Sequence, residues 1–284
     1  MEAITKQNKL FPAEPDCPVR FPYKFFIFTF IWSWIIWIFI ALWSNGIIPG
    51  YESLKNFKYP LAALGAFGPM AGALFSLRKN LSGESIRDYL KRCLDLKIGW
   101  KAYVFPIVIF GGITFISWIL PEFSGEDRLP MLLPSLWIFI PCLIFMMFLG
   151  GGQEEFGWRG YALPILEQKY GIWLANIILG LIWAFWHIPL WFIEGTTQVY
   201  MNYSGFVLFS VGCSLILSWF MRLSDNKPFA GIYAHGLANA FIAIMPVIVL
   251  QKHLPQPRYW IWVVSTLLVG IIITVYRKDG TLRT

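Results

Sequence analysis

The chain has 284 residues, of which 57% are hydrophobic, 18% are aromatic and only 14% are charged, and its mean hydropathy is +0.59. A soluble domain of this length carries more charge, so the composition excludes an ordinary soluble protein and predicts an all-α, multi-pass integral membrane protein. The net charge of +7 does not indicate nucleic-acid binding, because the Lys and Arg residues form short clusters between apolar runs, where they set orientation in a lipid bilayer.

The amino-terminal residues 1–24 are polar and predict a cytoplasmic segment. They precede a hydrophobic run of about 20 residues, which is too long for a signal-peptide core, so we expect an uncleaved first span. Residues 25–276 are expected to form a single membrane domain, and residues 277–284 a cytoplasmic tail. The four cysteines are widely spaced without a CxxC pair, so neither a disulfide framework nor a thiolate metal site is predicted.

Eight apolar stretches are long enough to cross the hydrocarbon layer as helices, which takes roughly 20 residues each. They lie near residues 25–45, 60–77, 101–120, 132–150, 172–193, 205–221, 230–250 and 259–276. The second and sixth are short, which fits an inward tilt or a partly re-entrant path. We expect about eight transmembrane helices that form one bundle with an intramembrane polar cavity.

The distribution of Lys and Arg gives the orientation of these spans. With the amino terminus inside, the cytoplasmic segments hold 18 of these residues and the outer loops hold 5. Because cytoplasmic segments carry the excess of basic residues, this split predicts eight spans with both termini cytoplasmic. Residues 82–96 have apolar residues near the 3.6 period with bases between them, which predicts an amphipathic helix on the inner leaflet. A compact chain without an organelle signal fits a bacterial plasma membrane.

Two adjacent glutamates, Glu154 and Glu155, follow the apolar run 132–150 within the string GGQEEFGWRG. A carboxylate near the centre of a membrane helix costs roughly 2.5–3.5 kcal/mol on insertion scales, so it tends to persist where it has a partner and a function. Glu155 and Arg159 are at i and i+4 and predict a structural ion pair, whereas Glu154 is rotated by about 100° and can face a cavity. The alternative is a solvated charged turn at the inner interface.

Two of the three histidines, His187 and His235, fall inside predicted spans. Asn239 lies one helical turn after His235 and shares its helix face. Trp183 precedes His187 by four residues and is a candidate pocket wall, while Pro189 can bend the helix and release a carbonyl near the histidine. Each of these residues also has a simpler interpretation, namely hydrogen bonding or packing between helices.

One carboxylate, two imidazoles and a carboxamide from three segments suit hydrolysis. A Glu can take a proton from water, a His can orient that water or bind a metal, and N–H groups can stabilise an oxyanion. The sequence contains no HExxH or GxSxG motif, so the usual zinc and serine protease signatures do not apply. If zinc binds, its ligands come from separate helices, with Glu154, His187 and His235 as candidates. The residues alone leave a polar intramembrane site of unknown chemistry.

The three motifs together resemble the CPBP family, which comprises CAAX proteases and Abi-like bacteriocin-processing enzymes. Residues 154–159 fit its EExxxR motif, His187 fits an aromatic-xxx-His motif, and His235 with Asn239 fits an HxxxN motif. The motifs cover residues 153–240 and place a CPBP-like catalytic core at about 130–250. One departure is visible, because Trp183 stands where the family usually has Phe.

This resemblance implies a multi-helix intramembrane endopeptidase, whose eukaryotic members remove the last three residues of prenylated proteins. By the same analogy Glu154 and His187 activate the water, and His235 and Asn239 form the oxyanion site. The resemblance leaves open whether zinc is a cofactor or the enzyme is a glutamate-dependent hydrolase. The expected partners are the lipid bilayer and a peptide or membrane-protein substrate. Two other classes stay open, namely a non-proteolytic immunity factor or scaffold, and a transporter.

Overall fold

The computed structural model describes residues 19–78 and 84–278 of the chain, and within these ranges every regular element is helical. The predicted all-α, multi-pass membrane fold is therefore confirmed. Buried apolar side chains from Phe25 to Val263 form one hydrophobic cluster that connects both halves of the sequence. The predicted terminal segments 1–24 and 277–284 lie largely outside the described residues.

The amino-terminal third folds into a helical hairpin followed by a short helix. Its elements are α2 (Tyr23–Ser44), α3 (Tyr51–Leu54), η1 (Lys55–Phe57), α4 (Lys58–Ala66), α5 (Gly68–Arg78) and α6 (Ile86–Cys93). Helices α4 and α5 meet at an angle of 40°, so the second predicted span is bent. Gly65 and Gly68 lie directly against side chains of α2, and Ser33 Oγ donates to the Gly65 carbonyl over 2.7 Å. Small residues thus allow the two arms of the hairpin to pack closely.

The predicted amphipathic segment 82–96 forms a shorter helix than expected. Helix α6 begins after Ser85, whose hydroxyl accepts from the Asp88 amide, and residues 82–83 lie outside the described part. Its buried face, with Tyr89 and Cys93, packs against protein. The predicted position on the inner leaflet stays a prediction.

The middle of the chain contains the most irregular helices. It comprises α7 (Trp100–Ile119), η2 (Leu120–Ser124), η3 (Leu136–Ile138), α8 (Phe139–Phe148), η4 (Gly152–Glu154), α9 (Glu155–Gly157), η5 (Trp158–Ala162) and α10 (Leu163–Trp186). Element η5 is a π-helical turn, a form that occurs mostly as single turns and often at functional sites. Within α10, Gly171 has φ +72°, a left-handed value that interrupts the helix there.

The carboxyl-terminal third consists of η6 (Ile188–Phe192), η7 (Thr197–Tyr200), α11 (Tyr203–Leu223), α12 (Phe229–Ile244) and α13 (Pro257–Lys278). Helices α11 and α13 touch through backbone, because a Cβ at Gly212 would lie 2.6 Å from the Leu267 Cα. Polar side chains join α10 to α11, where Ser214 Oγ donates to Asn176 Oδ1 over 2.9 Å. This central packing holds α11 mostly buried.

Five helical stretches of the described residues are long and apolar enough to cross a membrane, and a sixth is obtained when the bent pair α4 and α5 counts as one span. One of the five, Leu136–Phe192, overlaps most of two predicted spans, and α12 is apolar but shorter than a span. The predicted count of eight is therefore not confirmed and stays a prediction.

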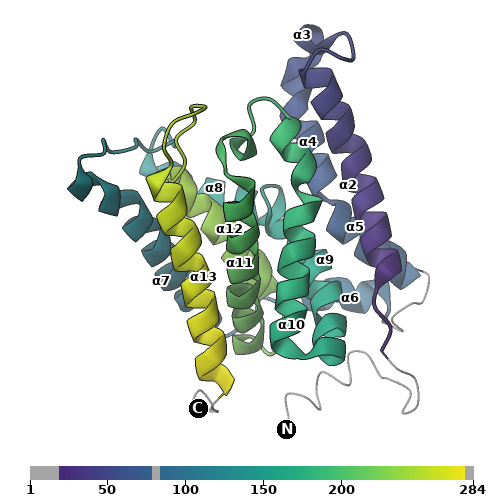
Figure 1. The fold of residues 1–284 in the computed structure, drawn as a ribbon. Coiled ribbons are helices and arrows are strands. Elements are labelled where there is room, and N and C mark those ends of the chain that lie inside the picture. Colours follow the sequence, from purple (N-terminus) through teal and green to yellow (C-terminus); the bar gives the residue numbers. More distant parts are fainter. Residues whose placement is uncertain (1–18, 79–83, 279–284) are drawn as a thin grey trace.

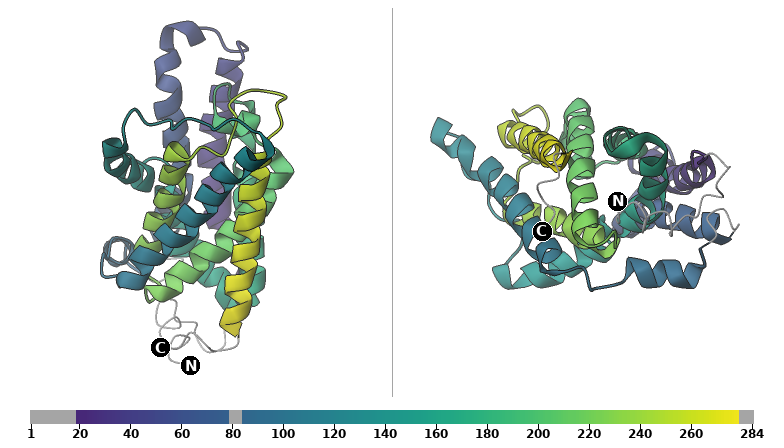
Figure 2. Two further views of the ribbon diagram at one scale, coloured as in Figure 1. Left: turned by 90° about the vertical axis from the view of Figure 1, so that its left-hand side faces the viewer. Right: turned by 90° about the horizontal axis from the view of Figure 1, so that it is seen from below.

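The long helices run roughly side by side, with α2 and α5 at one side of the molecule and α7 with α13 at the other (Figures 1 and 2). Helix α2 begins and helix α13 ends at the same end of the bundle (Figure 1). An even number of crossings, as the charge distribution predicts, fits this arrangement. The segment that holds η4, α9 and η5 lies inside the bundle, in contact with α5, α8 and α12.

Candidate functional site

The site starts from three consecutive glycines that lead from α8 into η4. Gly151 has φ +127°, which only glycine adopts readily. A Cβ at this position would lie 2.5 Å from Asn239 Nδ2 and 2.9 Å from His235 Nε2. The lack of a side chain therefore lets the backbone before the glutamates lie directly against the HxxxN residues of α12.

Elements of the amino-terminal third support the glutamate segment from the other side. Gly157 in α9 lies so close to the backbone of Pro69 in α5 that a side chain would clash there. The Tyr89 hydroxyl of α6 donates to the Phe156 carbonyl, and Arg92 donates to the Gly160 carbonyl over 3.0 Å. The part of the chain without motifs thus positions the EExxxR segment.

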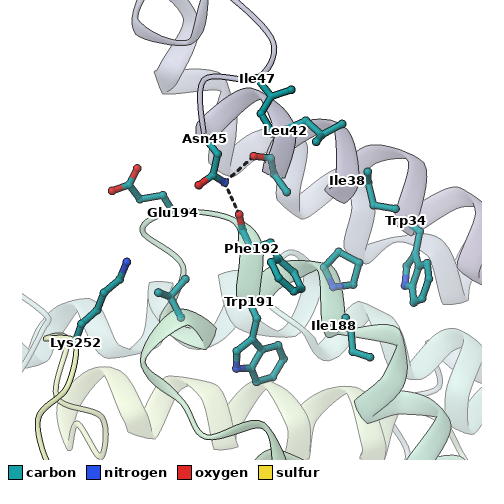
Figure 3. Close-up of a pocket in the computed structure, with 13 residues that line it drawn as sticks. Trp34, Ile38, Leu42, Asn45, Ile47, Ile188, Trp191, Phe192, Glu194 and Lys252 are labelled. Atoms are coloured by element: carbon teal, nitrogen blue, oxygen red, sulfur yellow. Dashed lines mark hydrogen bonds between the residues drawn. The ribbon is translucent and has the colours of Figure 1, made fainter.

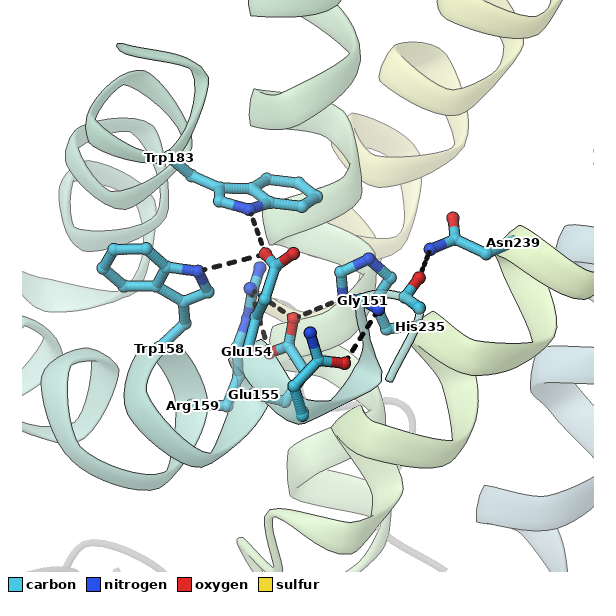
Figure 4. Close-up of polar contacts among 10 residues, drawn as sticks. Gly151, Glu154, Glu155, Trp158, Arg159, Trp183, His235 and Asn239 are labelled. Atoms are coloured by element: carbon cyan, nitrogen blue, oxygen red, sulfur yellow. Dashed lines mark hydrogen bonds and ion pairs between the residues drawn. The ribbon is translucent and has the colours of Figure 1, made fainter. Parts of the chain in front are cut away.

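The carboxylate of Glu154 is only 4% exposed and is held by two indoles. Its Oε2 accepts from Trp183 Nε1 over 2.7 Å and from Trp158 Nε1 over 3.4 Å (Figure 4). The sequence interpretation left Glu154 without a partner, and the structure differs here. The carboxylate is oriented by neutral donors, which do not compensate its negative charge.

Glu155 is fully buried and links two of the motifs. Its carboxylate lies 3.0 Å from Arg159 Nη1, the partner that the i, i+4 spacing indicates, and its Oε1 also lies 2.8 Å from His235 Nδ1 (Figure 4). The second contact was not expected from the sequence. Arg159 is also fully buried, with its guanidinium 5.6 Å from the centre of the Trp183 ring, a favourable cation–π distance.

The hydrogen bonds of the two histidines define which ring nitrogen is protonated. His187 Nδ1 lies 2.8 Å from the Trp183 carbonyl, which can only accept, so Nδ1 carries the proton and the Nε2 of the neutral ring is an acceptor. This carbonyl is available because α10 ends at Trp186 and the His187 amide bonds to Ala184 instead. In His235 the Nδ1 proton points to the Glu155 carboxylate, which leaves Nε2 beside Gly151.

The four residues predicted to be catalytic surround Trp183 and Gly151. The Trp183 ring lies 5.5 Å from the His187 ring and 5.4 Å from the His235 ring, centre to centre, and binds Glu154 through its nitrogen. Asn239 Nδ2 donates to the Gly150 carbonyl over 2.7 Å (Figure 4). Glu154, His187 and His235 are all buried, so these three side chains point into protein rather than into lipid. The motifs therefore meet in one place inside the bundle.

Two donors of this site were missed in the sequence. Trp158 follows Glu154 by four residues, the same spacing that indicated the Glu155–Arg159 pair, so its contact was readable from the helix period. Trp183 was interpreted as a pocket wall, whereas its N–H donates the shorter of the two hydrogen bonds to Glu154. The usual Phe of the family motif has no such donor.

The metal candidates Glu154, His187 and His235 do not form a ready ligand set. Among residues 19–78 and 84–278, no group of three His, Cys, Asp or Glu side chains is placed to hold a metal ion. Both imidazoles nevertheless donate through Nδ1 and keep Nε2 available, which is the arrangement that metal-binding histidines use. The prediction of a zinc site stays a prediction.

A cavity of about 720 Å³ lies between the end of α2 and η6 (Figure 3). It is lined mainly by apolar side chains, among them Ile38, Leu42 and Trp191, and Asn45 closes one side by donating to the Phe192 carbonyl over 2.7 Å. Ile188 connects this cavity to the neighbouring His187. The four motif residues are not part of its lining, so we assign it no role in the chemistry.

Comparison with known proteins agrees with the motifs. Residues 135–241 match the model of a family described as type II CAAX prenyl endopeptidase Rce1-like. Over 236 residues the chain is 26% identical to CAAX prenyl protease 2 of Methanococcus maripaludis. This alignment covers 77% of this chain and 82% of the relative. The resemblance to the CPBP family is confirmed. The chain is also 23% identical over 261 residues to lysostaphin resistance protein A of Staphylococcus haemolyticus, covering 87% of this chain and 66% of that protein.

The CPBP relationship supports a membrane-embedded protease. All three CPBP motifs lie within the matched residues 135–241, including the last residue of HxxxN. The relatives come from an archaeon and a bacterium and support a membrane protein, while the kind of membrane and the orientation of the termini stay predictions.

Proposed function

We propose that the chain is an intramembrane endopeptidase that hydrolyses a peptide bond of a membrane-associated peptide or protein. The observation that carries the proposal is the buried Glu154 carboxylate, held by Trp183 within the same side-chain cluster as His187 and His235. The neutral N–H donors orient this carboxylate through Oε2 and leave its second oxygen to take a proton. This is the arrangement that a general base requires.

In the proposed reaction Glu154 takes one proton from a water molecule as the water oxygen attacks the carbonyl carbon. His187 Nε2 accepts a hydrogen bond from the other O–H of the water, which stays bonded to the oxygen, and so orients the water, because the His187 Nδ1–H is already donated to the Trp183 carbonyl. The new C–O bond gives a tetrahedral oxyanion. The proton held by Glu154 then passes to the leaving nitrogen as the C–N bond breaks.

The oxyanion is proposed to bind His235 and Asn239. Asn239 uses one amide hydrogen for the Gly150 carbonyl and has a second one to donate. His235 donates from Nε2 when its ring carries both protons, with Nδ1 donating to the Glu155 carboxylate. Preorganised donors of this kind typically contribute a factor of about 10²–10³ each to kcat.

The proposed substrate class follows from the relatives and from the site depth. One relative is named a CAAX prenyl protease, which favours a substrate with a carboxyl-terminal cysteine motif and a lipid modification. The site lies inside the helical bundle, so a substrate in or at the lipid bilayer reaches it most directly. We place the enzyme in the plasma membrane with both termini cytoplasmic.

The test uses purified protein in detergent and fluorescence-quenched peptides, with and without a prenylated cysteine near the carboxyl terminus. Wild-type protein should cleave at least one peptide. Glu154→Gln should lower kcat by at least about 10²-fold, since it keeps the shape of the side chain and loses the basic oxygen. Glu122→Gln is the matched control, because Glu122 pairs with Arg128 in the connection after α7, far from the motifs in the sequence. Cleavage at the wild-type rate by the Glu154 variant would refute the proposed base.

Metal analysis of the active protein distinguishes the two chemistries. Full activity without bound zinc would exclude a zinc-dependent enzyme. Stoichiometric zinc that is lost in both His187→Ala and His235→Ala, together with inhibition by chelators that zinc reverses, would establish one.

A non-proteolytic role is the second candidate, because one relative is named a lysostaphin resistance protein. In that case the polar cluster stabilises the bundle and needs no base. The wild type would then cleave no peptide, and cells with the Glu154→Gln protein would be as resistant to lysostaphin as cells with the wild type.

A further inference from the structure

Gln153 is a buried amide that neither the motifs nor the proposed mechanism uses. It precedes Glu154 in η4 and is 1% exposed. Its Oε1 accepts from the Gly151 amide over 2.8 Å, whereas its Nε2 has no hydrogen-bond partner among residues 19–78 and 84–278. A buried polar group without a partner is destabilising, so its presence calls for an explanation.

The orientation of this amide follows from its one hydrogen bond. The Gly151 N–H can only donate, so the side-chain atom that faces it is the oxygen and the other atom is the NH₂ group. A flipped amide would place two donors against each other. The second side-chain atom is therefore a true donor, with two hydrogens to give.

This donor belongs to the same cluster as the proposed oxyanion groups. Gly151 binds the Gln153 amide through its nitrogen, and its α-carbon lies against Asn239 Nδ2 and His235 Nε2. Two carboxamides and one imidazole thus surround a single glycine, close to the acid–base segment. Asn239 has already given one hydrogen to Gly150, whereas the Gln153 NH₂ group has given none to any described residue.

We propose that Gln153 is a further catalytic residue, whose Nε2 donates to the carbonyl oxygen of the scissile peptide bond and to the oxyanion that forms from it. This inference rests on the proposed peptidase function. The substrate carbonyl oxygen would be the acceptor for Gln153 Nε2, which has no acceptor among the described residues. The Gly151 hydrogen bond keeps the amide oriented before the substrate arrives, so little conformational entropy is lost on binding.

Two variants of Gln153 test the proposal with the peptide that the wild type cleaves. Gln153→Glu keeps an oxygen acceptor for the Gly151 amide and removes the NH₂ group, while Gln153→Met removes both polar functions at similar volume. Both should lower kcat by about 10²–10³-fold with KM changed less than about twofold, because the donor acts mainly on the transition state. The unfolding temperature of Gln153→Met in detergent should stay close to that of the wild type, whereas Gln153→Glu, which adds a buried carboxylate, should unfold at a lower temperature.

Gln256→Glu is the matched control. Gln256 also accepts from a backbone amide and donates to a backbone carbonyl, both of Val249, but it lies in the connection before α13. Its kcat should be that of the wild type.

The outcomes separate this inference from the proposed function. If the wild type cleaves, Glu154→Gln does not, and either folded Gln153 variant keeps the wild-type kcat, this inference alone is overturned. If kcat falls only in proportion to a lower unfolding temperature, Gln153 is structural and the inference is overturned as well. A wild type that cleaves none of the peptides would overturn both proposals together.

Discussion

At the scale of single residues, indole nitrogens supply the hydrogen bonds that charged groups supply in many other sites. Trp183 and Trp158 give Glu154 its hydrogen bonds without neutralising it, and Trp183 also lies over the Arg159 guanidinium. An indole combines a large apolar surface with one donor, so it is easily accommodated in lipid-like surroundings. The site therefore orients a carboxylate with donors that carry no charge.

The indole donor of Trp183 gives a prediction about stability. Trp183→Phe should lower the free energy of unfolding by about 1.5–3 kcal/mol more than the loss of ring size alone, because a hydrogen bond to a charged group is lost. Trp186→Phe is the control, since Trp186 is fully buried and its Nε1 has no partner among the described residues. Thermal unfolding of both variants in detergent measures the difference, and equal losses would contradict it. Hydrolysis should survive in Trp183→Phe, because the family motif carries Phe at this place.

At the scale of elements, the sequence predicted the regular helices well and the irregular ones poorly. The runs that became α2, α7, α11 and α13 are continuous and apolar, so hydropathy alone locates them. The segment from η4 to η5 includes a 3₁₀ turn and a π-helical turn, and these depend on close packing against Pro69 and α12. A periodicity argument assumes one regular helix and cannot detect such changes.

The limits at the site have the same origin. The Glu155–Arg159 and Glu154–Trp158 contacts each join residues four positions apart, so helical periodicity predicts both. The bond from His235 to Glu155 joins residues 80 positions apart and depends on how α12 docks. No spacing rule predicts a contact of this kind.

The glycine turn before η4 gives a prediction at this scale. Gly151→Ala should reduce kcat by at least about 10²-fold. Alanine is strained at the positive φ of this residue, and its Cβ would lie 2.5 Å from Asn239 Nδ2 and 2.9 Å from His235 Nε2, so both side chains must move. Gly112→Ala in α7 is the control, since a Cβ added there would have no described atom within 4 Å apart from its chain neighbours and the backbone of its own helix. Peptide cleavage and the unfolding temperature should be measured for both. Wild-type kcat in a folded Gly151→Ala protein would show that this glycine does not set the site geometry.

At the scale of the whole molecule, the arrangement of helix ends bears on topology. The start of α2 and the end of α13 lie at one end of the bundle, together with the connection between α11 and α12 (Figure 1). The connections after α2 and after α12 lie at the opposite end (Figure 1). The alternation predicted from the basic residues therefore has a counterpart in the fold, although the number of spans stays a prediction.

Cysteine accessibility measures this topology in cells. Single cysteines at residues 85, 125, 198 and 282 should report inside, outside, outside and inside, because cytoplasmic segments hold 18 of the 23 Lys and Arg residues. The natural cysteines are first replaced by Ser, with activity as the control for folding. A carboxyl terminus that reports outside would show an odd number of crossings.

The contacts of the two glutamates also have a consequence for biosynthesis, since a ribosome delivers their partners at different times. Arg159 emerges four residues after Glu155, so that charge is compensated as soon as the first turn of helix forms. Glu154 waits 29 residues for Trp183, and Glu155 waits 80 for His235. A nascent chain that stops before α12 therefore lacks His235, the partner of Glu155 in that helix. The order of residues along the chain thus supplies the cationic partner of Glu155 first, and the neutral donor Trp183 and then His235 only later.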